Sequence, residues 1–145
     1  GLSMRTAKKK SASATSGTPA PMLAPATVEL EYKKLFARFE EAFLTHNMKL
    51  MHTCLSPAFV WHLPNGQSAY GREAAMTAMR KRFAMPDGPR FTDSVFRFKG
   101  TTVIQTYNVE YRGADGQWRE SRGMDIYEIA EGLIVSKDAF WKMLP

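Results

Sequence analysis

The sequence has a single cysteine, Cys54, so no disulfide can form within the chain. No apolar run approaches the roughly 18 residues that a membrane-spanning helix needs. The N-terminal residues also lack the apolar segment of a secretory signal. We therefore expect a cytoplasmic protein that has no membrane partner.

Acidic residues are absent from the first 26 residues, where Arg5 and the run Lys8-Lys9-Lys10 supply all the charge. The formal net charge of the chain is +6, of which only +2 belongs to residues 27–145. The basic character thus lies in a segment rich in Ser, Thr, Ala and Pro, a composition typical of disorder. We expect a disordered basic tail at residues 1–26, one folded domain at residues 27–145, and no nucleic-acid partner.

The sequence also lacks the motifs of the common cofactor sites. Its glycines lie in short turns, such as those around Gly88 and Gly132, and not in a phosphate-binding loop. No group of His, Cys and carboxylate residues has the spacing of a metal site. We expect neither a metal nor a cofactor.

Three segments show the apolar periodicity of amphipathic helices. The first spans Val28–Thr45 and the second is a short helix over Met48–Leu55, which Asn47 can cap. The third spans Gly71–Met85, with Arg82 on the flank of its apolar stripe. A proline soon after the second helix is expected to end it.

Five segments are rich in β-branched and aromatic residues and are expected to be strands. Because the helices and strands are segregated along the chain, the fold class is predicted to be α+β, with three helices covering one face of a curved, mostly antiparallel sheet. Such a sheet encloses a cone that can hold a ligand. The predicted strands are Ala58–Leu63, Arg90–Lys99, Thr101–Tyr111, Trp118–Ile129 and Leu133–Trp141.

The hairpin formed by the last two strands carries a charged residue within each of them, Asp125 and Lys137. A three-residue loop with Gly132 in the left-handed position places Asp125 opposite Lys137, which is an attractive pair. A two-residue loop places Asp125 opposite Asp138 instead. The hairpin alone leaves both registers open.

The order of elements, the stretch FVWHLPNG followed by YGREA, and the hairpin MDIYEIAEGLIVSKDAFW resemble the SnoaL-like branch of the NTF2-like (cystatin-like α+β) superfamily. Polyketide cyclases belong to that branch, and ketosteroid isomerases and limonene-epoxide hydrolases are its relatives. The resemblance covers about Val28–Trp141. It implies a homodimer that pairs through the outer face of the sheet, where Phe96, Phe98 and Trp118 would supply apolar area.

The resemblance carries over only part of the relatives' machinery. Asp125 matches the isomerase Asp that donates to the oxyanion, whereas Phe39 and Leu63 stand where the isomerase pattern has its Tyr and its general base. In the hydrolases an Asp on the last strand activates water, and counting from the turn glycine puts Ala139 there. That count turns Lys137 inward and favours the register that pairs it with Asp125.

The candidate catalytic residues follow from this comparison. Asp125 is predicted to accept or donate a proton, and Lys137 to tune it or to hold an oxyanion. His62, at the place of a water-holding hydrolase Asn, is the third candidate, although strand alternation leaves open whether His62 or Trp61 faces the pocket. The predicted substrate contacts are Trp61, Phe39, Leu63, Tyr107, Val109 and Trp141.

The leading hypothesis is a cofactor-free isomerase, cyclase or dehydratase that acts by proton transfer on a small apolar organic molecule. The alternative is a non-catalytic module of the same fold that binds a ligand or forms a dimer.

Overall fold

The computed structural model describes residues 24–144. The predicted disorder of residues 1–23 therefore lies outside the described residues. Helix α1 (Pro25–Thr45) begins two residues earlier than the predicted domain boundary, so residues 25 and 26 belong to the helix and not to the tail. Pro25 suits the first helical position because its φ is already helical and no backbone N–H is needed there.

The three predicted helices are confirmed. Helix α2 (Met48–Cys54) is capped by Asn47, whose side chain accepts a hydrogen bond of 3.0 Å from the backbone N–H of Leu50. Helix α3 (Arg72–Ala84) buries Ala75, Met76 and Met79 against the sheet. The corresponding apolar stripe of α1 consists of Leu35, Phe36, Phe39 and Ala42.

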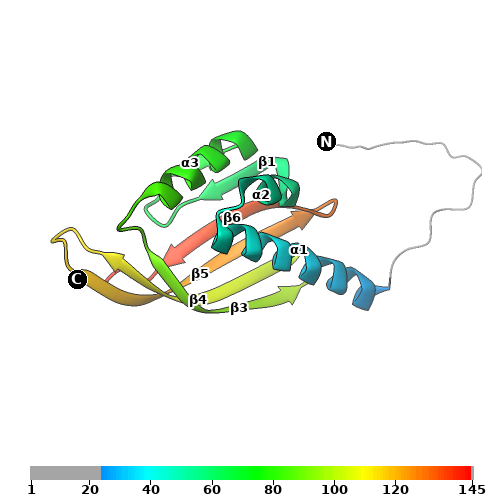
Figure 1. Cartoon of the computed structure of the whole chain (residues 1–145). Coiled ribbons are helices and arrows are strands. Elements are labelled where there is room, and N and C mark those ends of the chain that lie inside the picture. Colours follow the sequence, from blue (N-terminus) through cyan, green and yellow to red (C-terminus); the bar gives the residue numbers. More distant parts are fainter. Residues whose placement is uncertain (1–23, 145) are drawn as a thin grey trace, which may run out of the picture.

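The strands form one six-stranded sheet with the order β2-β1-β6-β5-β4-β3. Only β1 and β6 pair in parallel, and all three helices lie on the same side of the sheet (Figure 1). The fold is thus the predicted α+β cone, of the NTF2-like, cystatin-like type. The strands are β1 (Leu55–His62), β2 (Ser68–Tyr70), β3 (Arg90–Lys99), β4 (Thr102–Arg112), β5 (Trp118–Ala130) and β6 (Leu133–Trp141).

Two details of the sheet differ from the prediction. Strand β2 was not predicted, because three residues are too few to show a period. Strand β1 begins at Leu55, immediately after α2, and Pro57 lies inside it. The pairing of β1 with β6 shifts between Leu55 and Val60, and this irregularity accommodates a residue that has no N–H for the ladder.

Several aromatic rings pack against one another in the core between the helices and the sheet. The ring of Phe36 packs edge-on against Phe96, Phe98 and Tyr127, with centroids 5.5, 5.7 and 4.9 Å away. The prediction that Phe96 and Phe98 lie on the outer face of the sheet is therefore wrong. The register of β3 shifts between Thr92 and Val95, and such a shift changes which residues of a strand face the core.

The hairpin adopts neither predicted register. Its loop is Glu131-Gly132, both with positive φ, as in the tight turns that join twisted strands. A bulge then adds one residue to β6, so Asp125 lies opposite Ala139, and Lys137 lies opposite Tyr127. Asp125 and Lys137 are diagonal neighbours on one face of the sheet.

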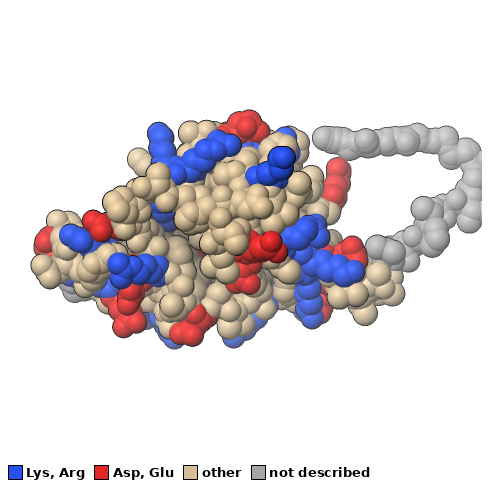
Figure 2. Space-filling model, viewed as in Figure 1, with Lys and Arg blue, Asp and Glu red and all other residues tan. Residues whose placement is uncertain are grey.

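The surface carries charges of both signs. On the face shown in Figure 2, basic and acidic side chains are interspersed among uncharged ones. Among residues 24–144, no helix is both long and apolar enough to cross a membrane.

Candidate functional site

A cavity of about 330 Å³ lies between the concave face of the sheet and the helices. Its floor is formed by β3 to β6, and its sides by α1, the end of α3 and the segment that follows α3. Most of its wall is apolar and aromatic. The sequence-predicted residues Phe39, Trp61, Tyr107, Asp125, Lys137 and Trp141 all line it.

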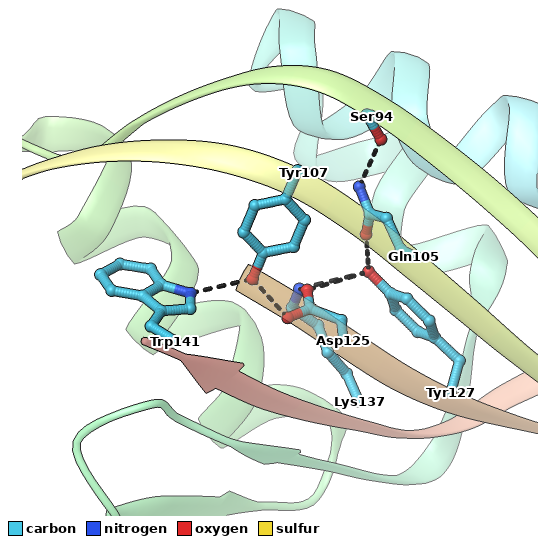
Figure 3. Close-up of polar contacts among 7 residues, drawn as sticks. All are labelled: Ser94, Gln105, Tyr107, Asp125, Tyr127, Lys137 and Trp141. Atoms are coloured by element: carbon cyan, nitrogen blue, oxygen red, sulfur yellow. Dashed lines mark hydrogen bonds and ion pairs between the residues drawn. The ribbon is translucent and has the colours of Figure 1, made fainter. Parts of the chain in front are cut away.

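Asp125 lies in the middle of β5 and is 3% exposed. Its Oδ1 accepts a hydrogen bond of 2.6 Å from the hydroxyl of Tyr107, and its Oδ2 forms an ion pair with Nζ of Lys137 (Figure 3). Burial of a lone carboxylate would be costly, so these two partners allow the charge to stay in the apolar wall.

Lys137 is 6% exposed and reaches Asp125 from the neighbouring strand β6. Its Nζ also donates to the hydroxyl of Tyr127 at 3.3 Å. The ammonium lies 5.2, 5.7 and 5.9 Å from the ring centroids of Tyr127, Phe43 and Trp61, at distances where aromatic faces stabilise a cation. An ammonium has three N–H bonds, so one remains for a ligand after these two contacts.

Two tyrosine hydroxyls complete the polar centre. The hydroxyl of Tyr107 accepts a hydrogen bond of 2.8 Å from Nε1 of Trp141 while it donates to Asp125. The hydroxyl of Tyr127 donates to Oε1 of Gln105 at 2.6 Å. Burial, and then the charge of Asp125, raise the pKa of both tyrosines. Both phenols therefore stay protonated and act as hydrogen-bond donors.

Gly123 on β5 makes room for this arrangement. It pairs with Tyr107 on one side and with Trp141 on the other. A Cβ at this position would overlap the Tyr107 ring and lie 2.8 Å from the Trp141 ring. The absence of a side chain lets the two rings meet over β5, so that the Tyr107 hydroxyl reaches Asp125.

Three predicted site residues are not brought to the cavity. His62 follows the inward-facing Trp61 and points to the other side of β1, where its Nδ1 shares a hydrogen bond of 2.7 Å with Oγ of Ser68. Val109 is buried in a separate cluster behind Tyr107. Leu63 lies just beyond the end of β1 and packs at the edge of the main core.

Other cavity residues were not predicted. Tyr127 lies two residues after Asp125 on the same strand, so the period of two was a usable signal for it. Gln105 on β4 links Tyr127 to Oγ of Ser94, to which its Nε2 donates at 2.7 Å. Arg82, assigned to a helix flank, also lines the cavity. Its place in the cavity could not be predicted from the sequence, because the position of α3 over the sheet depends on tertiary packing.

The cavity holds no arrangement typical of a metal centre. Within the described part of the chain, no three His, Cys, Asp or Glu side chains are grouped as metal ligands would be.

Comparison with known proteins assigns the chain to a family. The model of the SnoaL-like domain family matches residues 36–137, from the middle of α1 to the middle of β6. No curated protein shows a significant sequence match to the chain.

Solved structures show the same fold. A provisionally named polyketide cyclase from Xanthomonas campestris pv. campestris superposes with a TM-score of 0.66 at 20% identity, covering 78% of this chain and 91% of that one. A provisionally named ketosteroid isomerase from Kribbella flavida gives 0.64 at 15% identity, with 79% and 80% covered. A protein of unknown function with a cystatin-like fold, from Xanthomonas campestris, gives 0.63 at 20% identity, with 76% and 89% covered.

Proposed function

The chain belongs to the SnoaL-like domain family, and from this membership and the cavity geometry we propose that it binds a small, largely apolar organic molecule and catalyses cofactor-free proton transfer on it. Isomerisation, cyclisation and dehydration are the reactions of this class. The observation that carries the proposal is the buried ion pair of Asp125 and Lys137 in the cavity wall, with two phenol donors beside it.

The buried ion pair carries a large desolvation cost, which an apolar wall at the same place would not have. Replacing a buried ion pair by apolar residues of similar volume is often neutral or stabilising, so stability alone does not explain its presence. A carboxylate, an ammonium and two neutral phenols within one cavity are the groups that proton transfer needs. This supports a catalytic role for the centre.

The proposed chemistry assigns one role to each group. Asp125 takes a proton from a carbon next to a carbonyl, and the electron pair of the broken C–H bond moves onto the carbonyl oxygen. The third N–H of Lys137, which has no partner among the described residues, stabilises the resulting enolate. Asp125 then returns the proton to another atom of the substrate, so no cofactor is consumed.

The names of two structural neighbours support the same class of reaction. One is named as a polyketide cyclase and the other as a ketosteroid isomerase. At 20% and 15% identity the likeness extends to the fold, so the reaction class is inferred mainly from the cavity residues.

A base in an apolar cavity can be tested without the natural substrate. Nitrobenzisoxazole is a suitable probe, because removal of its ring proton breaks the N–O bond and releases a coloured cyanophenolate. We expect the protein to accelerate this reaction and Asp125→Asn to lower the rate by about 100-fold or more, the usual contribution of a positioned base.

The matched control is Asp138→Asn, because Asp138 is the other aspartate of the hairpin and does not line the cavity. It should leave the rate unchanged. An equal rate for wild type and Asp125→Asn would contradict the role of Asp125. If wild type binds the probe without accelerating its reaction, the alternative function is favoured.

The alternative is a non-catalytic ligand-binding module, and one observation supports it. Asp125 already accepts hydrogen bonds on both oxygens, so this carboxylate is paired without a ligand. In this version the ion pair orients a bound molecule and does not react with it.

We also propose that the chain forms a homodimer through the outer face of the sheet. Phe140 is 49% exposed there, and it shares a surface groove with Ile104 and Met124. Phe140→Glu should therefore shift the mass measured by light scattering from dimer to monomer. A monomeric wild type at micromolar concentration would contradict the dimer.

A further inference from the structure

The cavity contains a second cation, and its environment differs from that of Lys137. Arg82 lies in the last turn of α3 and is half-buried in the cavity wall. Its guanidinium lies 5.4 Å from the Trp61 ring centroid and 5.9 Å from that of Trp141. Aromatic contacts of this kind position a guanidinium without using its N–H groups.

The guanidinium of Arg82 makes no hydrogen bond and no ion pair with any residue that the structure describes. The other cations of the wall do: Lys137 is paired with Asp125, and Arg90 is paired with Glu110 at 3.6 Å. Burial lowers the pKa of Arg82, and its interactions with Tyr107 and with the Asp125 carboxylate offset part of that shift. Arginine is so basic that it remains charged, and none of its five N–H donors has an acceptor among residues 24–144.

The remaining titratable groups of the wall do not supply that acceptor. Glu40 on α1 lines the cavity but makes no ion pair with Arg82. His46 is stacked face to face on Phe83, with the two centroids 4.1 Å apart. The hydroxyl of Tyr107 is held between Trp141 and Asp125.

A second unused donor lies beside Arg82. Trp61 is 2% exposed and lines the cavity, and its Nε1 is buried without a hydrogen-bond partner among residues 24–144. Buried polar groups are nearly always paired, so an unpaired donor at a cavity wall indicates that a ligand atom completes it. Two adjacent donors, one of them charged, are suited to an anionic acceptor.

We propose that the ligand of this cavity is an organic acid: a ring-bearing, largely apolar molecule whose carboxylate is bound by the Arg82 guanidinium, with Trp61 Nε1 as an additional donor. The planar guanidinium fork matches the two oxygens of a carboxylate. The inference deepens the proposed function, on whose ligand-binding part it rests. It does not require the protein to be a catalyst.

The location of Arg82 also gives the acid an orientation. Its carboxylate is held beside Trp61 and Trp141, and its apolar body extends along a wall that reaches Asp125 and Lys137. The substrate class is thereby narrowed from apolar molecules in general to acids whose reacting carbon lies away from the carboxylate.

The test compares naphthoate, the anion of naphthalenecarboxylic acid, with its neutral isostere naphthamide. Isothermal titration calorimetry with wild type should show about tenfold or more tighter binding of the acid, since a charge-assisted hydrogen bond contributes that much. Arg82→Met should abolish the preference. The matched control is Arg80→Met, because Arg80 is an exposed arginine two residues earlier on the same helix; it should keep the preference.

Two further measurements guard against a misfolded variant. Trp61→Phe removes the indole N–H but keeps an aromatic ring beside Arg82, and it should weaken binding of the acid by a few-fold more than binding of the amide. Raising the salt concentration from about 50 mM to about 500 mM should weaken binding of naphthoate to wild type and leave naphthamide unchanged.

The outcomes separate this inference from the proposed function. Equal affinity of wild type for acid and amide, or a preference that survives in Arg82→Met, overturns the acid-binding role and leaves ligand binding intact. Binding of neither molecule, with inorganic phosphate equally without effect, contradicts the ligand cavity itself. Displacement of naphthoate by phosphate alone would show a general anion site and would also overturn the inference.

Discussion

The two cations of the cavity wall, Lys137 and Arg82, are placed in opposite ways. Lys137 comes from the sheet and is bound by a carboxylate and a phenol, so its charge is satisfied within the protein. Arg82 comes from a helix end, and its guanidinium lies over the rings of Trp61 and Trp141 with no hydrogen bond or ion pair among residues 24–144. Removing one partner of a buried ion pair destabilises the fold, whereas an unpaired charge at a cavity is available for binding a ligand. The two sites should therefore respond differently to the same kind of substitution.

The largest effect is expected for Lys137→Met. It leaves Asp125 buried without its counter-ion, and breaking a buried pair in this way costs about 3–5 kcal/mol. Urea denaturation should show this loss in the free energy of unfolding. The double variant Lys137→Met with Asp125→Leu should recover much of it, and a loss below about 1 kcal/mol in the single variant would contradict the pairing.

Gly123→Ala should have the next largest effect on stability. The added Cβ overlaps the rings of Tyr107 and Trp141, and overpacking of this kind costs about 1–3 kcal/mol. If the Tyr107 ring moves away from the added Cβ, its hydroxyl separates from Asp125, and the environment of the Asp125–Lys137 ion pair is weakened. A melting temperature equal to that of wild type would show that the rings can move aside freely.

The pH dependence of stability tests the phenols beside Asp125. Because the folded-state pKa values of Tyr107 and Tyr127 are raised, the unfolded chain loses these protons first as the pH rises. Their contribution is complete below the unfolded tyrosine pKa of about 10 and is lost above it, at up to about 1.4 kcal/mol per pH unit for each tyrosine.

Unfolding by urea at a series of pH values on either side of the tyrosine pKa measures this slope. Tyr107→Phe should reduce the pH dependence of the free energy of unfolding by the contribution of one tyrosine. Cys54, whose pKa burial also raises, contributes equally to wild type and variant and cancels in the difference. Identical slopes for the two proteins would contradict the buried Tyr107–Asp125 contact.

The smallest effect is expected for Arg82→Met. The substitution removes two cation–π contacts, which destabilises the fold. It also removes a half-buried charge that has no counter-ion, which stabilises the fold, so the two effects oppose each other. The free energy of unfolding should change by less than about 1 kcal/mol. A loss as large as that of Lys137→Met would mean that Arg82 is a structural residue, and the difference between the two cations would disappear.

Much of the architecture could be predicted from the sequence, because it rests on local periodicity. The stripe of α1 and the cap at Asn47 are encoded by residues three or four apart. The shared face of Lys137, Ala139 and Trp141 follows from alternation along a single strand. The hairpin register does not, because a single bulge in β6 changes every pairing beyond it.

The direction of the remaining side chains depends on contacts between distant segments. Alternation left Trp61 and His62 equivalent until the parallel pairing of β1 with β6 put Trp61 in the cavity. Phe96 and Phe98 face the core because the register of β3 shifts ahead of them. Neither outcome has a signal in the neighbouring residues.

The sequence by itself determined an α+β chain with a carboxylate and an ammonium in the two strands of a terminal hairpin. Only the tertiary structure decided that two tyrosine hydroxyls join that pair and that Arg82 reaches the same cavity without a partner. The physical reason is that periodicity fixes which face of its own element a side chain occupies. Which groups meet across a cavity is fixed by the packing of helices against a twisted sheet, where a one-residue shift changes the neighbours.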